Sequence, residues 1–474
     1  MIILGTNSIK DTGFDVANSV RLDGTTAYLN RTPGSASNRK TFTFSTWIKR
    51  SGISGVSTHQ DIFSSDAGDD ESYIHFVSDN LKIYSTLPAG TAAAGDPACV
   101  LITNQVFRDF SAWMHIVVAV DTTQGTAANR AKLYINGTQV TSFSTETYPD
   151  QNYLFATNAA VPHMIGRRPA GSKFLPGYLA ETVLVDGSQL APTSFGEFDE
   201  DSGIWKPIDV SGLTFGTNGF YLDYEDSGDL GDDESGNGND FTENNLAAVD
   251  QSIDTCTNNF STLNPLISSN ASFLEGNLRC NFASSGEYGS DSSIGITSGK
   301  WYAEFKFTAG ANHYLILGVN DQNGQNERSR SDGSAGKGGA TGTIGYRCSD
   351  GKYRVNNSHT SYGGSGGDGN IFSIAIDKDN GKVYFAVDGT YGNSGNPATN
   401  SNGIDVSSVL TGDTWFFNVG NDTGASETQV EANFGSPSYS ESGGETDGAG
   451  FGNFAHAVPS GYFSLCTKNL AEYG

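Results

Sequence analysis

Residues 41–50 read TFTFSTWIKR, and this stretch decides the fold class. Its apolar side chains alternate, so that Phe42, Phe44 and Ile48 share one face of an extended chain and Trp47 lies on the other face. Successive side chains of a β-strand point to opposite faces of its sheet. The stretch therefore predicts a strand inside a β-sandwich.

Three further stretches extend this pattern through the first half of the chain. WMHIVVAVD at 113–121 is almost continuously apolar and predicts a central strand. KLYINGTQV at 132–140 turns at Asn136–Gly137, a dipeptide that accommodates positive φ in a tight hairpin. SVRLDGTTAYL at 19–29 alternates around Asp23–Gly24 and predicts another hairpin. We expect these segments to share one sheet.

The second half repeats the strand pattern without repeating the sequence. GKWYAEFKF at 299–307 predicts a strand, as do the shorter runs YLILGV, TIGYRC and WFFNVGN. IFSIAIDKDNGKVYFAV at 371–387 alternates on both sides of Asn380–Gly381 and predicts a hairpin. A second sheet-rich module therefore follows the first.

Composition sets the class and the number of domains. A single hydrophobic core stops growing at roughly 250–300 residues, so a chain of 474 residues predicts two domains. The 60 glycines and 13 prolines favour frequent turns between short strands, with almost no helix. We predict an all-β protein of two antiparallel β-sandwiches.

Charge excludes two classes of partner. The chain has 27 Lys and Arg against 53 Asp and Glu, a formal charge of −26, which repels nucleic acid and anionic membranes. No apolar run approaches the ~20 residues of a membrane-spanning helix, so we expect no membrane insertion.

The cysteines and the first residues indicate where the chain folds. The five cysteines are scattered and contain no C-x-x-C pair, which favours free core thiols: Cys99, Cys256, Cys280, Cys348 and Cys466. Met1–Gly5 is apolar but lacks the basic segment and cleavage site of a secretory leader. We expect folding in a reducing cytoplasm.

The ordered set LDGTTAYL, FTFSTWIKR, WMHIVVAVD and LYINGTQV resembles a laminin-G-like domain of the concanavalin A superfamily. This resemblance covers roughly the first 225 residues. The second half, from GKWYAEFKF to WFFNVGN, resembles a SPRY domain. The two resemblances imply that both sandwiches are concanavalin A-like jelly rolls.

Other stretches resemble structural proteins of bacteriophage particles. They are DESGNGND at 233–240, DTCTNNFSTLNP at 254–265, which has Cys256 where phage sequences usually carry Pro, and PSGYFSLCTKNL at 459–470. The resemblance implies a surface-exposed virion protein of a tailed phage, made in the host cytoplasm. We expect a tail-fibre or tail-tip adhesin for host-surface glycan. The alternative is a capsid decoration or head-fibre protein with purely structural contacts, and a glycan depolymerase is a third possibility by fold analogy.

The chain then divides into four parts. They are an N-terminal docking segment at 1–18, a laminin-G-like sandwich at 19–225, an Asp/Gly/Asn-rich connector at 226–269 and a SPRY-like sandwich at 270–474. Residues 1–18 carry apolar side chains that need a partner, either another virion protein or the edge of their own sandwich. Phage fibres of similar composition are trimers, so we expect a homotrimer.

One segment of the connector has the spacing of a calcium loop. Alternate oxygen-bearing side chains converge on a cation when a glycine permits a sharp turn, here at Asp233, Ser235, Asn237, Asn239 and Asp240. Asn244 stands where a bidentate Glu is needed, and the same residues suit an Asx turn. No cofactor is required, and calcium and a plain turn both stay open.

The stretch 345–370, GYRCSDGKYRVNNSHTSYGGSGGDGN, is the candidate glycan-binding loop. Aromatic rings stack on sugars while amides and guanidinium groups bond hydroxyls, and the residues of these types are Tyr353, Arg354, Asn356, Asn357, His359 and Tyr362. The alternative is a long loop that carries these residues for its turns.

Catalysis has no support in the sequence. A glycosidase needs paired carboxylates in defined separation, and the nearest candidates, Glu197, Asp199 and Asp201, lie in a turn-rich segment. The histidines form no metal-binding or Ser–His pattern. We predict that the protein is not an enzyme.

Overall fold

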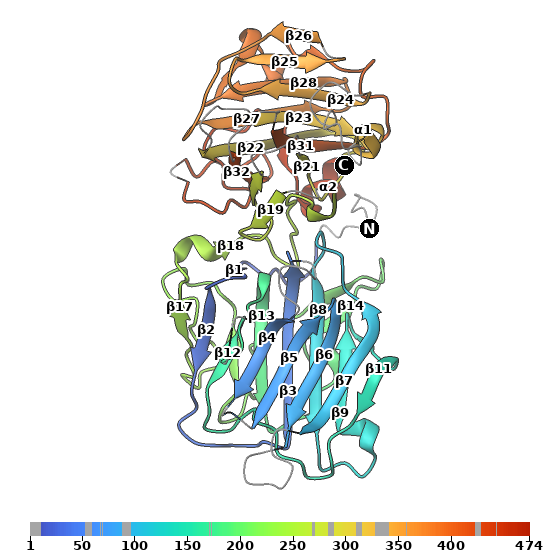
Figure 1. The fold of residues 1–474 in the computed structure, drawn as a ribbon, viewed down its shortest axis with the longest axis vertical. Coiled ribbons are helices and arrows are strands. Elements are labelled where there is room, and N and C mark those ends of the chain that lie inside the picture. The colour runs from blue at the N-terminus through green and yellow to red at the C-terminus, as the bar shows by residue number, and fades with distance from the viewer. Residues whose placement is uncertain are drawn as a thin grey trace. The chain divides into compact units, whose positions relative to one another are not determined.

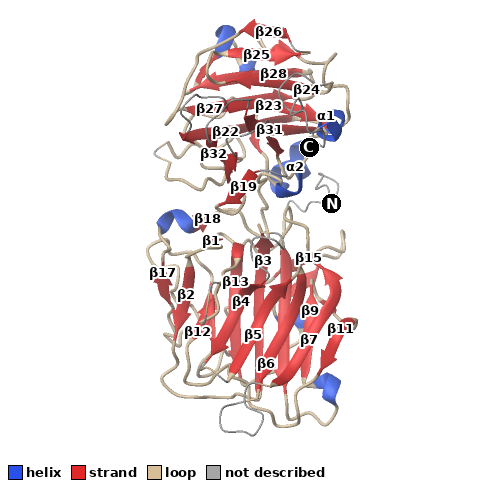
Figure 2. Cartoon of the chain, viewed as in Figure 1, coloured by secondary structure: helices blue, strands red, loops and turns tan. Residues whose placement is uncertain are grey.

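A computed structural model describes residues 11–52, 59–66, 68, 70–87, 96–169, 171, 173–267, 271–282, 289–309, 315–327, 341–356, 358–421, 428–441 and 443–474. It divides into two compact units, with Thr12–Thr257 in one and Asn258–Gly474 in the other. We call them the N-terminal and the C-terminal unit and describe each by itself. Strands and loops account for nearly all of the described residues (Figure 2).

The first sheet of the N-terminal unit has the order β10-β9-β8-β3-β13-β1-β18, and β16 also pairs with β13. All pairs are antiparallel. Its strands are β1 (Ser19–Asp23), β3 (Thr41–Arg50), β8 (Met114–Asp121), β9 (Ala131–Ile135), β10 (Thr138–Gln139), β13 (Pro176–Asp186), β16 (Phe220–Leu222) and β18 (Gln251–Ser252).

The second sheet has the order β11-β7-β6-β5-β4-β12-β2-β17, and its middle strands lie side by side in Figure 1. Its strands are β2 (Tyr28–Arg31), β4 (His59–Asp66), β5 (Glu71–Val77), β6 (Asn80–Thr86), β7 (Pro97–Val106), β11 (Phe143–Thr147), β12 (His163–Ile165) and β17 (Thr242–Asn244). A separate pair joins β14 (Gly196–Phe198) to β15 (Trp205–Pro207).

The core of the N-terminal unit lies between these two sheets. Phe42, Phe44 and Ile48 of β3 belong to it, as their alternation predicted, and the ring of Phe44 stacks on that of Phe63 from the opposite sheet at 4.8 Å. Trp47 belongs to a smaller cluster on the other face of β3. The prediction of an antiparallel sandwich is confirmed.

Turn chemistry gave one correct and one wrong prediction. Asn136 and Gly137 both have positive φ, 46° and 75°, and join β9 to β10 as a tight hairpin. Asp23–Gly24 was expected to close a hairpin too, but β1 and β2 lie in different sheets. The Asp23 carboxylate accepts the backbone N–H groups of Thr25 and Ala27, and this turn carries the chain across the sandwich.

The predicted connector, 226–269, differs from the observed boundary between Thr257 and Asn258. Within it, β17 pairs with β2 and β18 pairs with β1. The carboxylate of Asp254 is buried against Lys49, with Nζ and Oδ2 2.6 Å apart. Residues 226–257 are therefore part of the N-terminal sandwich, because their polar groups find partners on its strands.

The predicted docking segment, 1–18, is described only from residue 11 onward. Val16 is buried in the cluster that contains Trp47, and Phe14 packs against it. Thr257 donates its hydroxyl to the carbonyl of Val16. These two apolar residues cover their own sandwich, which was the alternative to docking, while Met1–Lys10 lie outside the described residues.

The C-terminal unit also has two sheets. The larger has the order β19-β20-β32-β22-β27-β28-β29, with β30 beside β28 and β33 parallel to β22. Its strands are β19 (Ala271–Leu274), β20 (Arg279–Phe282), β22 (Lys300–Ala309), β27 (Ile371–Asp377), β28 (Lys382–Val387), β29 (Thr390–Tyr391), β30 (Ile404–Asp405), β32 (Thr428–Asn433) and β33 (Phe463–Ser464).

The smaller sheet has the order β21-β31-β23-β24-β25-β26. Its strands are β21 (Gly289–Asp291), β23 (Leu315–Asp321), β24 (Thr343–Arg347), β25 (Lys352–Val355), β26 (Ser358–Ser361) and β31 (Trp415–Asn421). The short helices α1 (Gln322–Glu327) and α2 (Thr467–Tyr473) belong to the same unit. No helix in the described residues is long and apolar enough to cross a membrane.

Candidate functional site

The predicted glycan-binding loop, 345–370, contains the hairpin β25–β26 at the edge of the smaller sheet. Tyr362 is only 8% exposed, and its ring packs edge-on against Tyr346 and Phe385. Tyr353 packs against Tyr362 in turn, with ring centroids 6.0 Å apart. Tyr362 is therefore a core residue, and the two tyrosines do not form an exposed platform for a sugar.

The polar candidates of this loop lie apart from its tyrosines. Arg354 and His359 are register partners across the hairpin, one position along from Tyr353, so they project from the opposite face. His359 and Asn356 are exposed, Asn356 has a positive φ of 48°, and Asn357 lies outside the described residues. The structure thus does not bring the predicted residues together, and sugar binding by this loop stays a prediction.

Asp233, the first residue of the predicted calcium loop, already uses both carboxylate oxygens. Oδ1 accepts the backbone N–H groups of Tyr221 and Ser235 at 2.9 and 3.0 Å. Oδ2 accepts the N–H of Asn239 at 2.7 Å and the hydroxyl of Ser235 at 2.8 Å. This is the hydrogen bonding of an Asx turn.

The remaining calcium candidates are engaged in the same way. Asn237 and Asn239 each donate a side-chain N–H to the carbonyl of Gly219, and Asp240 accepts the N–H of Asp233. The guanidinium of Arg31 donates to Asn239 Oδ1 and lies close enough to Asp233 and Asp240 for their charges to raise its pKa, against the larger lowering by burial. The geometry favours the plain turn. In the described part of the chain, no three His, Cys, Asp or Glu side chains gather as metal ligands.

A different group of side chains comes together on the second sheet of the N-terminal unit. Ile74 and Phe76 of β5, like Leu81 and Ile83 of β6, point into the core, so the residues between them face outward. Register places these outward residues in two rows, Asp61–His75–Lys82 and Ser64–Tyr73–Tyr84. With Arg168, which follows β12, we call Asp61, Tyr73, His75, Lys82 and Tyr84 the Arg168 cluster.

Arg168 ties the cluster together. Its Nη2 and Nε donate to Asp61 Oδ1 at 2.9 and 3.2 Å, and Nη2 lies 2.7 Å from His75 Nδ1. Its guanidinium lies 3.9 Å from the ring centroid of Tyr73, close enough for a cation–π interaction. Side chains of two strands, β4 and β5, thus converge on the guanidinium of Arg168, whose side chain is 18% exposed.

Two polar atoms beneath Arg168 have hydrogen-bonding capacity left over. His75 Nδ1 lies 3.1 Å from Asp61 Oδ1, and burial lowers the pKa of this imidazole, which favours its neutral form. His75 Nε2 and Asp61 Oδ2 are buried and have no hydrogen-bond partner in the described residues. Buried polar atoms without partners are uncommon in folded proteins, and they often occur at functional sites.

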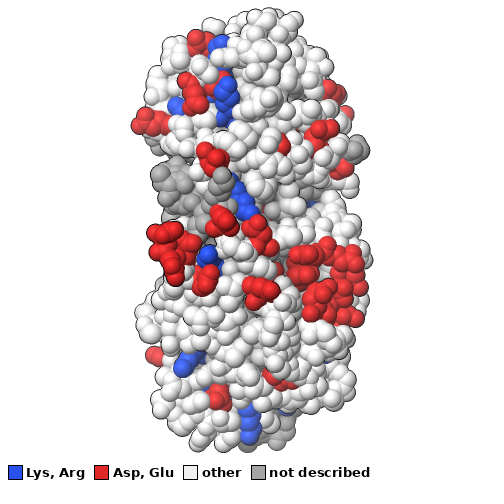
Figure 3. Space-filling model, turned by 180° about the vertical axis from the view of Figure 1, so that it is seen from behind, with Lys and Arg blue, Asp and Glu red and all other residues white. Residues whose placement is uncertain are grey.

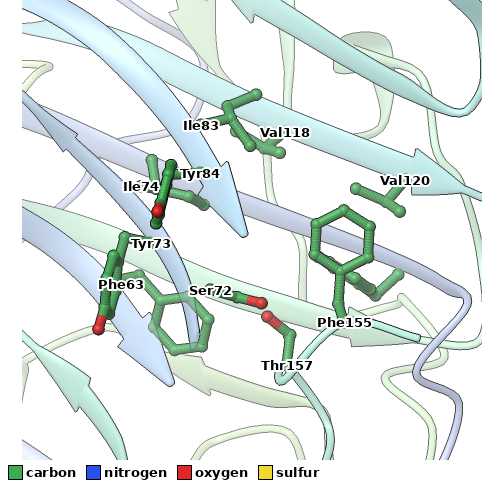
Figure 4. Close-up of a pocket in the computed structure, with 11 residues that line it drawn as sticks. Phe63, Ser72, Tyr73, Ile74, Ile83, Tyr84, Val118, Val120, Phe155 and Thr157 are labelled. Atoms are coloured by element: carbon green, nitrogen blue, oxygen red, sulfur yellow. The ribbon is translucent and has the colours of Figure 1, made fainter. Parts of the chain in front are cut away.

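The rim of the cluster is half-exposed. Lys82 Nζ lies 4.1 Å from the ring centroid of Tyr84, and burial lowers the pKa of Lys82 and raises that of Tyr84. Figure 4 shows a small cavity lined mainly by apolar side chains such as Phe63 and Ile74, together with Ser72, Thr157 and the cluster residues Tyr73 and Tyr84. Its volume of about 10 Å³ holds one water at most.

Sequence reasoning missed this cluster, although part of its signal was present. The alternation in ESYIHFV, residues 71–77, places Tyr73 and His75 opposite the core residues Ile74 and Phe76. The sequence alone therefore shows that an aromatic and a titratable residue share the outward face of this strand. The contribution of Arg168 was not detectable, because it follows β12 and meets β4 and β5 only in the folded unit.

The comparison with protein families bears on the same unit. Residues 23–190 match a laminin G model described as the concanavalin A-like lectin/glucanases superfamily. These residues form a concanavalin A-like lectin/laminin G domain. The match includes every strand and loop that contributes to the Arg168 cluster, from Asp61 to Arg168.

Solved structures resemble parts of the chain. The SPRY domain of human HERC1 is 14% identical, with 36% of this chain and 96% of that domain covered and a TM-score of 0.29. A heptameric SAP-like pentraxin of Limulus polyphemus is 14% identical, with 38% of this chain and 80% of that chain covered and a TM-score of 0.27. These likenesses concern the fold alone. No curated protein matches the chain.

Proposed function

We propose that this chain is a carbohydrate-binding protein and that the Arg168 cluster of its laminin G domain holds the sugar. The observation that carries the proposal is the convergence of Arg168, Asp61, His75 and Tyr73 on one outward sheet face. This face lies within the residues that match the lectin superfamily. Guanidinium, carboxylate, imidazole and phenol groups together can donate to and accept from sugar hydroxyls.

The exposure of these side chains distinguishes those that contact the ligand from those that position them. Arg168, Lys82 and Tyr84 are the accessible ones, so they contact the ligand, with the Tyr84 ring against its C–H face. Asp61 and His75 are buried and act as positioning residues that fix the guanidinium of Arg168. Their unpartnered Oδ2 and Nε2 atoms add polar capacity beneath it.

A glycan array tests the proposal with the full chain. Tyr84→Ser removes an aromatic wall without leaving a buried charge, and it should weaken binding about tenfold or more, equivalent to about 1.4 kcal/mol. Tyr134→Ser is the matched control, because Tyr134 is also half-buried but lies on β9 of the other sheet. Binding that survives Tyr84→Ser, or falls equally in both variants, would count against this site.

We further propose that the protein is exposed on a tailed-phage virion, as a homotrimeric tail-fibre or tail-tip adhesin for host-surface glycan that docks on other virion proteins. The resemblance of 233–240, 254–265 and 459–470 to phage proteins supports this proposal. The charge of −26 disfavours nucleic acid as a partner, and acidic side chains outnumber basic ones on the face in Figure 3.

Electron microscopy of purified particles, with mass measurement of the free chain, tests the virion proposal. Density for three copies at the tail would support it. Density on the capsid would favour decoration, and absence of the chain from particles would contradict both forms.

We propose no catalytic role. Glu197 lies in β14 and Asp199 directly follows this strand, and their carboxylates approach Lys206 Nζ of β15 at 3.3 and 3.5 Å. A glycosidase instead needs two carboxyl groups flanking a scissile bond. Release of reducing ends from a bound glycan, abolished by Glu197→Gln, would overturn this proposal.

A further inference from the structure

A surface hollow lies beside helix α2 in the C-terminal unit. Its volume is about 290 Å³. Two aromatic, two charged and two small or polar residues line it: Ala449, Phe451, Lys468, Asn469, Glu472 and Tyr473. Pockets for drug-sized ligands span about 300–1,000 Å³, so this one suits a single sugar ring better than an oligosaccharide.

One wall of the hollow is the loop that contains Ala449 and Phe451, and the other is helix α2. The buried carboxylate of Asp447 holds both in place. Asp447 Oδ1 accepts the backbone N–H groups of Ala449 and Phe451 at 2.9 and 3.0 Å. Asp447 Oδ2 accepts a side-chain N–H of Asn469 at 2.8 Å. Because Asp447 binds both the loop and the helix, the hollow is built into the fold before any ligand arrives.

Asn469 is a rigid part of the lining. Its Nδ2 donates to Asp447 Oδ2 and to the carbonyl of Ser464, which fixes the orientation of the amide. Asn469 is 1% exposed, and its Oδ1 has no hydrogen-bond partner among the described residues. This oxygen is buried and not accessible from the hollow, so Asn469 fixes the lining and does not itself contact the ligand.

The other lining groups define the ligand class. Tyr473 is 39% exposed, and one face of its ring stacks on Phe463 at 3.7 Å, which leaves the opposite face for a ligand. The half-buried ring of Phe451 is a second apolar surface. Lys468 and Glu472 carry opposite charges, so the hollow selects for neither sign. Aromatic faces combined with donors and acceptors of both kinds suit a neutral, polyhydroxylated ring.

We propose that this hollow binds one neutral sugar residue, whose C–H face packs on Phe451 and Tyr473 and whose hydroxyls meet the charged groups of Lys468 and Glu472. The site lies on the C-terminal unit and does not depend on the Arg168 cluster of the N-terminal unit. The chain then carries two sugar sites of different chemistry, one on each unit. Two linked sites raise avidity for a glycan-covered surface without stronger single contacts.

Saturation-transfer difference NMR on the full chain tests the hollow, with the methyl glycosides of glucose, galactose, mannose and N-acetylglucosamine as probes. Ala449→Trp fills the hollow without removing a polar contact and should weaken probe binding at least tenfold. Ala398→Trp is the matched control, because Ala398 is exposed elsewhere on the same unit. Tyr473→Ser, which removes an exposed ring, should weaken binding even if Ala449→Trp proves unstable.

The same experiment must distinguish probe binding in the hollow from probe binding at the Arg168 cluster. In the Tyr84→Ser variant, probe binding that depends on the hollow should persist, so failure of one site is distinguishable from failure of the other. Absence of saturation transfer to all four probes would overturn the proposal. Transfer that is equal in the parent chain, in Ala449→Trp and in Tyr473→Ser would overturn it too.

Discussion

The buried ion pair between Lys49 and Asp254 makes a sharp prediction about stability. Both side chains are 1% exposed, Nζ and Oδ2 are 2.6 Å apart, and Trp113 Nε1 donates to the other carboxylate oxygen at 2.9 Å. Asp254→Asn keeps the shape of the side chain and removes its charge. The buried ammonium of Lys49 then loses its nearest negative charge, and burial already lowers the pKa of Lys49.

The size of the effect follows from this geometry. Two unit charges 2.6 Å apart attract by about 6 kcal/mol at an effective dielectric constant of 20, before the cost of desolvating them. Breaking one partner of a buried pair costs about 3–5 kcal/mol. For a unit of 150–250 residues each kcal/mol shifts the melting temperature by about 2–4 °C, so Asp254→Asn should lower it by roughly 6–20 °C.

Calorimetry of the full chain, combined with hydrogen exchange read by mass spectrometry, assigns the loss to a unit. The N-terminal unit, Thr12–Thr257, should melt earlier while Asn258–Gly474 keeps its transition. The double variant Lys49→Met with Asp254→Leu should recover most of the stability, because an apolar pair can replace a buried ion pair. A loss below about 1 kcal/mol in Asp254→Asn, or no recovery in the double variant, would refute the reasoning.

Three further predictions concern the same unit. A chain that ends at residue 225 should fail to fold, whereas one that ends at 257 should melt cooperatively, because 226–257 supplies β17 and β18; circular dichroism during heating compares the two. Burial raises the pKa of Glu181 to about 8 from its ordinary 4.5, so this group stabilises the fold fully below pH 4.5 and loses that contribution as the pH rises to about 8; Glu181→Gln should flatten the dependence of denaturant midpoints between pH 5 and pH 8. Asp233→Ala should cost about 1.5–3 kcal/mol, since it removes hydrogen bonds to a charged group, while a chelator should leave the melting temperature of the parent chain unchanged.

The strands were predictable because their pattern is local. The alternation of Phe42, Phe44 and Ile48 identifies one buried face within ten residues of sequence. The dipeptide Asn136–Gly137 likewise predicts its turn from two residues alone. The wrong hairpin at Asp23–Gly24 shows where local reasoning fails. The same turn chemistry can join strands within a sheet or across a sandwich, and only the partners of β1 and β2 decide between them.

The candidate site was harder to predict for the same reason. Tyr353 and Tyr362 were predicted to be exposed for sugar binding because a Gly- and Asn-rich loop surrounds them. In the structure, however, the ring of Tyr362 is buried and packs against Phe385. Composition around a residue does not tell which face of a strand it occupies. Conversely, Tyr73 and His75 were hidden inside a strand, and their partner Arg168 is distant in sequence.

The misplaced connector points to a signal that sequence reasoning can use. Residues 226–257 look like a surface loop because they are acidic and rich in glycine. However, three basic residues stand in two strands of the first sheet that are largely buried: Arg21 in β1, and Lys49 and Arg50 in β3.

A buried cation requires an anion: Arg50 pairs with Asp79 at 3.2 Å, and the acidic segment supplies the counter-ions of the other two. Arg21 pairs with Asp250 at 3.3 Å, and Lys49 pairs with Asp254 at 2.6 Å. The cost of leaving a charge unpaired in the interior forces such a match. A lysine or arginine in the middle of a largely apolar strand therefore predicts that some distant, polar-looking segment is part of the core.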